Sequence, residues 1–369
     1  MNRLFRWDQM GLFLLALAAG ILPFAVPEVC AAALREGLTL CSGPLLLSLF
    51  PFLVVSRLLI QCPESDLLAL PFRLAAWGIG IRTPCAARVL CIGFLGGFAP
   101  AASAAAQAVR TGQLTAEEAD ALLPACICSG PSFVVLTVGQ SLLGSAELGV
   151  LLFASQITAN YLTAALLNRF AGVRSVKPGS AAPASPAPPR LDEILADAAI
   201  TYCKLCGFIL FFRMLAAGAG ALLPAGAGTL CAILLEVCSG CDLASRTGRW
   251  GSLLCCAALS VQGLSVLLQV RTICPPEMTL RPLYRSRWLH LPLSLALFYL
   301  LLPGGEADVF STLPVRVLLM RRVPPDCALL VFAVCCMAAC TLRSGIRQVE
   351  QKQMARNAGG CCINSKTLL

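Results

Sequence analysis

Charge is scarce in this sequence, and histidine occurs once. Of 369 residues, 13% are Asp, Glu, Lys or Arg, 58% are apolar, and the mean hydropathy is +0.80. A globular surface in water carries a larger charged share, so an ordinary soluble protein is excluded. With His290 as its single histidine, the chain has no set of residues spaced to bind a metal ion. It also has no glycine-rich phosphate loop and no paired aspartates in its apolar runs. We therefore expect no enzymatic activity, no cofactor and no bound metal.

Cysteine is abundant, with 21 residues, but most of them lie inside apolar runs. This placement favours small packing residues at helix contacts over a disulfide framework. The pairs Cys203 with Cys206 and Cys238 with Cys241 have redox or metal spacing, yet neither has a second pair or a histidine at a suitable distance.

Long windows without a charged residue predict membrane segments, because each could cross a hydrocarbon layer of about 30 Å. The windows are Gln9–Pro27, Gly37–Ser56, Val89–Val109, Ala121–Ala146, Leu148–Asn168, Met214–Leu235, Gly251–Val270, Trp288–Gly305 and Cys327–Leu342. A further apolar helix begins near Ala198 and tolerates Lys204 and Arg213. We predict an all-α fold, a polytopic transmembrane helical bundle of about eight to ten membrane segments, some of them not full spans.

The net charge of +9 resides in loops and chain ends rather than in a basic patch, so we expect a lipid bilayer and no nucleic acid as partner. Basic residues precede the first window and follow the last: Arg3, Arg6, Arg343, Arg347, Lys352 and Arg356. The positive-inside rule then places both termini in the cytosol. A signal peptide cleaved near Cys30 is the alternative for the first window, but that window is long and more follow.

The chain divides into six predicted segments: an N-terminal transmembrane helix at 1–37, a first repeat at 38–170, a Pro, Ala and Ser rich linker at 171–192, a second repeat at 193–303, an amphipathic segment with a last transmembrane helix at 304–342, and a basic tail at 343–369. The repeats are inferred from three short matches. Phe52–Leu59 aligns with Phe208–Leu215, Gly93–Gly97 with Glu236–Gly240, and Ser129–Val134 with Gln262–Leu267.

Internal duplication with glycine interruptions is typical of secondary transporters, whose helices unwind near the bilayer midplane. We predict breaks at Gly96, Gly130, Gly240 and Gly263, which should converge in one cavity with serine and glutamine side chains pointing inward. Unwound backbone must face protein, water or ligand, and the N-terminus of a half-helix suits an anion. The alternative is that these glycines only let helices approach closely. Between the first two breaks, Thr115 and Glu118 form a predicted capping box.

Three ionisable residues in apolar surroundings complete the predicted site, since such groups are functional by default. Lys204 and Arg213 would compensate an anionic substrate or, as the alternative, snorkel to an interface, whereas Arg57 near a span end is expected to snorkel. Glu236 would couple transport to an ion or form a salt bridge with Lys204 or Arg213. The predicted substrate-binding residues are Gly96, Gly97, Ser129, Gly130, Pro131, Ser132, Lys204, Arg213, Ser239, Gly240, Gln262, Gly263, Ser265 and Gln269. A serine with Lys204 as a hydrolase dyad is the weak enzymatic alternative.

At these motifs the chain resembles sporulation integral membrane proteins with nucleoside-recognition, or Gate, domains, which are similar to segments of concentrative nucleoside carriers. The resemblance covers about Leu38 to Leu302 and rests on Gly93–Phe98, Leu122–Phe133, Glu236–Gly240 and Gly263–Val270. It departs from the family pattern at Cys126, Ile127 and Cys128, where Asn-Asn is usual, and at Cys238, where threonine is usual.

The resemblance implies a carrier of dipicolinic acid in the outer forespore membrane of a spore-forming bacterium. We therefore expect a transporter for a small polar, anionic solute such as a dicarboxylate. A non-transporting scaffold for spore-envelope assembly and a nucleoside carrier are the alternatives. A homo-oligomer is compatible with the sequence.

Overall fold

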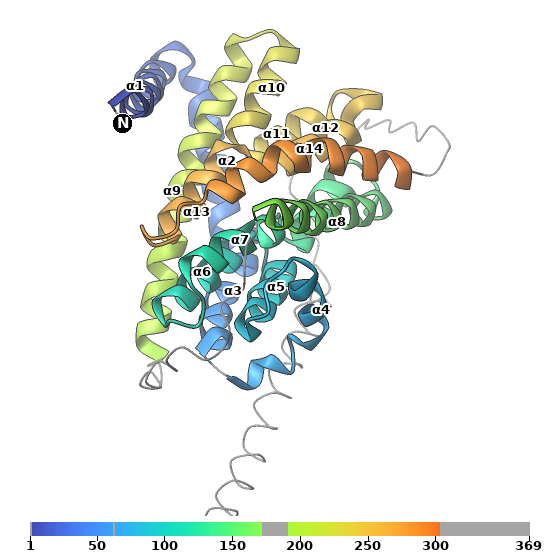
Figure 1. Cartoon of the computed structure of the whole chain (residues 1–369). Coiled ribbons are helices and arrows are strands. Elements are labelled where there is room, and N and C mark those ends of the chain that lie inside the picture. Colours follow the sequence, from blue (N-terminus) through green and yellow to red (C-terminus); the bar gives the residue numbers. More distant parts are fainter. Residues whose placement is uncertain (1, 62, 172–190, 303–369) are drawn as a thin grey trace, which may run out of the picture.

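The computed structural model describes residues 2–61, 63–171 and 191–302, which form α-helices α1 to α14 (Figure 1). Within these ranges there is no β-strand, so the predicted all-α class is confirmed. The central part of the predicted linker lies outside the described residues. So do the segments 304–342 and 343–369, including the predicted window Cys327–Leu342.

The first half contains α1 (Asn2–Ala25), α2 (Pro27–Ser42), α3 (Pro44–Gln61), α4 (Leu70–Gly78), α5 (Pro84–Gly96), α6 (Phe98–Arg110), α7 (Ala116–Cys126), the π-helix η2 (Ser132–Leu142) and α8 (Ala146–Ala171). The second half contains α9 (Leu191–Leu222), α10 (Ala225–Leu235), α11 (Val237–Ser245), α12 (Gly251–Val261), α13 (Gly263–Ile273) and α14 (Arg281–Leu301). Short 3-10 turns occupy Pro63–Asp66 and Gly248–Trp250.

Within the described ranges, three helical segments are long and apolar enough to cross a membrane, which fits a membrane protein: α8, α9 and the stretch Gly248–Ile273. A fourth is reached if the pair Phe13–Ala25 and Pro27–Ser42, bent by 109°, counts as one span. Several predicted windows are instead divided. Gly37–Ser56 is interrupted at Gly43 before Pro44, and Met214–Leu235 contains the turn before α10 at Pro224. Proline lacks the N–H that would continue a helix, which accounts for both interruptions.

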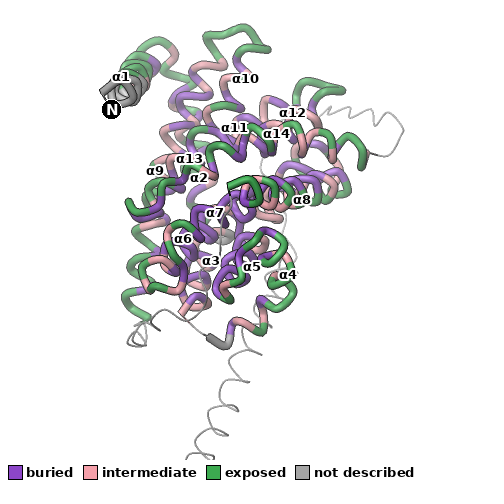
Figure 2. The backbone as a smooth tube through the Cα atoms, in the orientation of Figure 1, coloured by how far each residue is buried: buried purple, intermediate pink, exposed green. Residues whose placement is uncertain are grey.

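The buried core is concentrated in α5, α6 and α7, drawn in purple in Figure 2. Alanine fills most of α6, and the residues from Ala99 to Ala106 are all buried. Such small side chains let α3, α5 and α13 pack closely on α6. The predicted capping box is present: the Thr115 side chain accepts from Glu118 N–H, and the Glu118 carboxylate accepts from Thr115 N–H.

The long helix α9 packs against α2 and α10, while α8 packs against α14 and runs across the direction of α9 in Figure 1. Most of the described cysteines outside α9 are buried and unbridged, as the packing interpretation expects. The helices thus form a closely packed bundle in which the interrupted helices, α5 with α6 and α12 with α13, lie near the centre.

Candidate functional site

The first-half breaks cross each other at Gly97 and Gly130. Gly97 separates α5 from α6 with φ 80° and ψ −164°, a conformation that is essentially restricted to glycine. A Cβ atom on Gly97 would lie 2.7 Å from the backbone nitrogen of Gly130. Gly130 belongs to the non-helical residues between α7 and η2; Pro131 is the N-cap of the π-helix, which begins at Ser132. The predicted interruptions at Gly96 and Gly130 are therefore present and in contact.

The second-half breaks also cross, at Glu236 and Gly263. Gln262 adopts the left-handed conformation with φ 66° between α12 and α13, and Glu236 is extended between α10 and α11. A Cβ atom on Gly263 would lie 3.0 Å from the backbone nitrogen of Glu236. In both halves the order is a broken helix, a connection and a second broken helix that crosses the first; the duplication itself stays a prediction.

The predicted break at Gly240 is wrong by four residues. The Glu236 carboxylate accepts from the backbone N–H groups of Cys238 at 2.8 Å and Ser239 at 2.6 Å, so helix α11 already begins at Val237. Gly240 lies inside that helix, and a Cβ atom on it would lie 2.8 Å from Ile233 Cα. Gly240 therefore serves close packing between α10 and α11.

One hydrogen bond joins the two crossings. Gln262 Nε2 donates to Ser129 Oγ at 3.4 Å, and it also donates to the Leu259 carbonyl at 2.6 Å. Gln262 is 1% exposed, and its Oε1 has no hydrogen-bond partner among the described residues. A buried acceptor without a partner is costly, so the site has unmet capacity for a donor.

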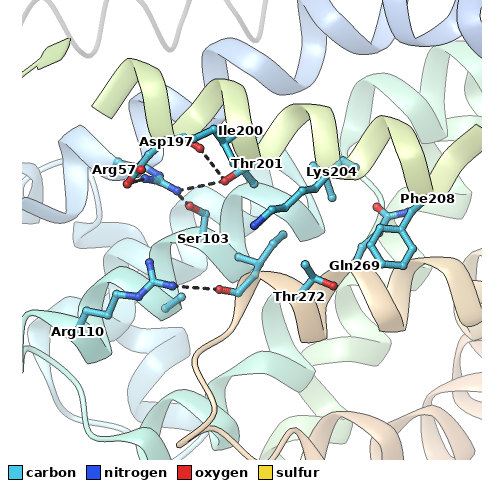
Figure 3. Close-up of a pocket in the computed structure, with 13 residues that line it drawn as sticks. Arg57, Ser103, Arg110, Asp197, Ile200, Thr201, Lys204, Phe208, Gln269 and Thr272 are labelled. Atoms are coloured by element: carbon cyan, nitrogen blue, oxygen red, sulfur yellow. Dashed lines mark hydrogen bonds and ion pairs between the residues drawn. The ribbon is translucent and has the colours of Figure 1, made fainter. Parts of the chain in front are cut away.

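A polar face of α13 leads from these crossings to a pocket. Gln262, Ser265 and Gln269 are spaced for one helix face and are all buried. Gln269 Nε2 donates to Ser265 Oγ at 2.9 Å, and Gln269 Oε1 is a second buried acceptor without a partner in the described part of the chain. Gln269 and Thr272 line the pocket at the far end of this face (Figure 3).

The pocket has a volume of about 160 Å³ and is lined by α3, α6, α9 and α13. Three cations line it, Arg57, Arg110 and Lys204, against one carboxylate, Asp197. In Figure 3 the Lys204 side chain extends into the pocket from α9. Within the described ranges, no carboxylate pairs with Lys204. The pocket therefore carries excess positive charge, which suits an anion.

Arg57 does not snorkel, contrary to the sequence expectation. It is 8% exposed, pairs with Asp197 at 2.5 Å and donates to Ser103 at 3.3 Å and to Thr201 at 3.2 Å. Its side chain turns inward because α9 and α6 both pack against α3: α9 offers the oxygens of Asp197 and Thr201, and α6 offers the hydroxyl of Ser103.

Arg213 lies away from the pocket. Its guanidinium pairs with Glu36 at 2.7 Å, which ties α9 to α2. Glu236 makes no salt bridge with Lys204 or Arg213 among the described residues, because both of its oxygens accept from the start of α11. The N-terminus of α11 thus already holds an anion from the chain itself.

Of the predicted site residues, Lys204 and Gln269 line the pocket, and Gly97, Ser129, Gly130, Gln262, Gly263 and Ser265 lie at the crossings or on the connecting face. Sequence reasoning missed Ser103, Arg110, Asp197 and Thr201. One signal pointed to Arg57: its alignment with Arg213 between the two halves.

The Asp197 carboxylate pairs with Arg57 in the pocket, so Asp197→Asn should strengthen binding of any dicarboxylate anion that the pocket accepts. Removing this carboxylate leaves three cations unopposed, and we expect a roughly threefold to tenfold lower Kd. Equilibrium binding to the detergent-solubilised chain measures it. Glu193→Gln, one turn earlier on α9 and outside the pocket lining, is the control. Weaker binding by Asp197→Asn would show that this carboxylate is needed to hold Arg57 in place.

Comparisons with protein-family models, curated proteins and solved structures gave no match for this chain. The resemblance to the sporulation family therefore stays a prediction, and the function has to be argued from the site itself.

Proposed function

We propose that this membrane protein transports a small organic anion, with the cation-lined pocket as its binding site. The observation that carries the proposal is the continuity between two features: crossed helix breaks and a pocket with excess positive charge, joined by the buried polar face of α13. Interrupted helices that expose backbone inside a bundle are the usual setting of substrate sites in secondary transporters.

A dicarboxylate matches the pocket better than a neutral solute. Moving two carboxylates out of water requires charged partners, and Arg57, Arg110 and Lys204 surround one cavity. Ser103, Thr201 and Gln269 add hydroxyl and amide groups that could orient a ligand. A nucleoside would need none of these cations. The resemblance favours dipicolinate as the substrate and a forespore membrane as the location.

Uptake by proteoliposomes tests the proposal. Vesicles that contain the full chain should accumulate labelled dipicolinate faster than empty vesicles, and an excess of unlabelled dicarboxylate should suppress this uptake. A labelled nucleoside is the comparison solute and should enter at the rate of empty vesicles. Equal dipicolinate entry into empty and protein-containing vesicles would contradict transport and favour a scaffold.

A further inference from the structure

A second buried polar cluster lies between α8, α12 and α14, outside the pocket. Its centre is Arg287 on α14, which is 8% exposed. Asn160 on α8 and Ser260 on α12, which both accept hydrogen bonds from Arg287, are fully buried, as is Thr163 one turn after Asn160 on α8. Because α14 packs against both α8 and α12, the guanidinium is enclosed by protein on these sides.

Arg287 has no carboxylate partner among the described residues. Its three hydrogen bonds are long: Nε to Ser286 Oγ at 3.3 Å, Nη1 to the Ser260 carbonyl at 3.3 Å, and Nη2 to Asn160 Oδ1 at 3.4 Å. These lie beyond the usual range for N–H···O bonds, and a guanidinium has five N–H donors. Part of its donor capacity is therefore unused.

Ser260 is near the C-terminal end of α12, whose partial negative charge is about half an elementary charge. That is too little to balance a buried guanidinium, and an uncompensated buried charge carries a large free-energy cost. His290, one turn after Arg287, adds no negative charge, because an imidazole is either neutral or cationic; its Nε2 lies 3.2 Å from the Gln156 carbonyl oxygen. A negative charge is missing from this cluster.

Two more buried groups in the cluster have no hydrogen-bond partner in the described part of the chain, Asn160 Nδ2 and Thr163 Oγ1. Both can donate a hydrogen bond, and they are one turn apart on the face of α8. An unused donor on Asn160 thus lies beside the unbalanced cation, and a second one, on Thr163, lies one turn further along α8.

We propose that Arg287, Asn160 and Thr163 form an inner anion site that binds a small carboxylate or a halide. This site is separate from the pocket at Lys204 and does not require that the protein be a transporter. The anion supplies the negative charge that Arg287 lacks and accepts from the unused donors.

Thermal unfolding of the full chain in detergent tests the site. Sodium chloride and sodium acetate are compared with sodium gluconate, whose anion is much larger than chloride or acetate, at equal sodium concentration. For the wild-type chain we expect chloride, acetate or both to raise the unfolding midpoint saturably, by about 3 °C. An effect of acetate alone identifies a carboxylate site, and an effect of chloride alone identifies a halide site.

Arg287→Gln should abolish this anion effect, whereas Arg285→Gln, which removes an exposed charge from the same helix, should keep it. Lys204→Gln should keep it too, so failure of the pocket and failure of this site are distinguishable.

If Arg287→Gln does not fold, the variant Asn160→Asp tests the site instead, because it places a carboxylate beside Arg287. That variant should be insensitive to added anions and at least as stable as the wild-type chain without them. The proposed anion site would be contradicted if the wild-type chain showed no anion effect, or if the effect persisted in Arg287→Gln or Asn160→Asp.

Discussion

Gly97→Ala is expected to lower the free energy of unfolding by about 3 kcal/mol and the unfolding midpoint in detergent by about 5–10 °C. Two physical terms add up at this residue. The backbone conformation of Gly97 is essentially closed to residues with a Cβ atom. The new Cβ would also lie 2.7 Å from the Gly130 nitrogen, so one of the two crossing segments has to move.

Two other glycines separate these terms. Gly80 has φ 89° and no atom within 4 Å of an added Cβ, so Gly80→Ala carries the backbone cost alone, about 1 kcal/mol. Gly207 lies inside α9 with open space around it, and Gly207→Ala should be neutral or stabilising. If Gly97→Ala were no more harmful than Gly80→Ala, the two first-half breaks would not be in contact.

Lys204→Gln should lower the initial rate of dicarboxylate uptake about tenfold to a hundredfold at substrate concentrations below saturation. The reason is that hydrogen bonds to a charged group are worth about 1.5–3 kcal/mol, and Lys204, like Arg110, is a pocket cation with which no described carboxylate pairs. Uptake by proteoliposomes with matched protein content measures this loss.

Arg213→Gln is the matched comparison, because it removes a cation from the same helix and leaves the pocket lining unchanged. Its guanidinium pairs with Glu36, so its loss should act on stability and change uptake by about threefold at most. The sequence alone favoured Arg213 and Lys204 together as substrate contacts. A larger loss of uptake in Arg213→Gln than in Lys204→Gln, at equal stability, would contradict the assignment of the pocket.

Local signals in the sequence predicted the helix interruptions well. Gly96 with Gly97 and Gln262 with Gly263 stand out because glycine, or a residue in the left-handed conformation, is needed where one half-helix ends and the next begins. Gly240 looked equivalent, but its role is close packing. The deciding residue is Glu236, whose side chain caps α11, and the sequence does not distinguish a capping carboxylate from an ion-coupling one.

Contacts between segments that are far apart in the chain could not be predicted from the sequence. Arg57 and Asp197 are 140 positions apart, and their pairing depends on how α3 meets α9. The same holds for Arg287. In the sequence it does not differ from the nearby basic residues Arg281 and Arg285, and only the packing of α14 against α8 and α12 shows that it is enclosed. Windows of low charge do not register turns such as the one before Pro224, so some of the predicted windows are divided between two helices.

The most direct test of the central claim is to locate a bound dicarboxylate in crystals of the full chain. Crystals grown with a bromine-substituted aromatic dicarboxylate should give an anomalous peak in the pocket at the end of α13, between Lys204, Arg57 and Arg110. A peak elsewhere in the bundle, or an empty pocket at saturating ligand, would contradict the claim that this pocket holds the transported anion.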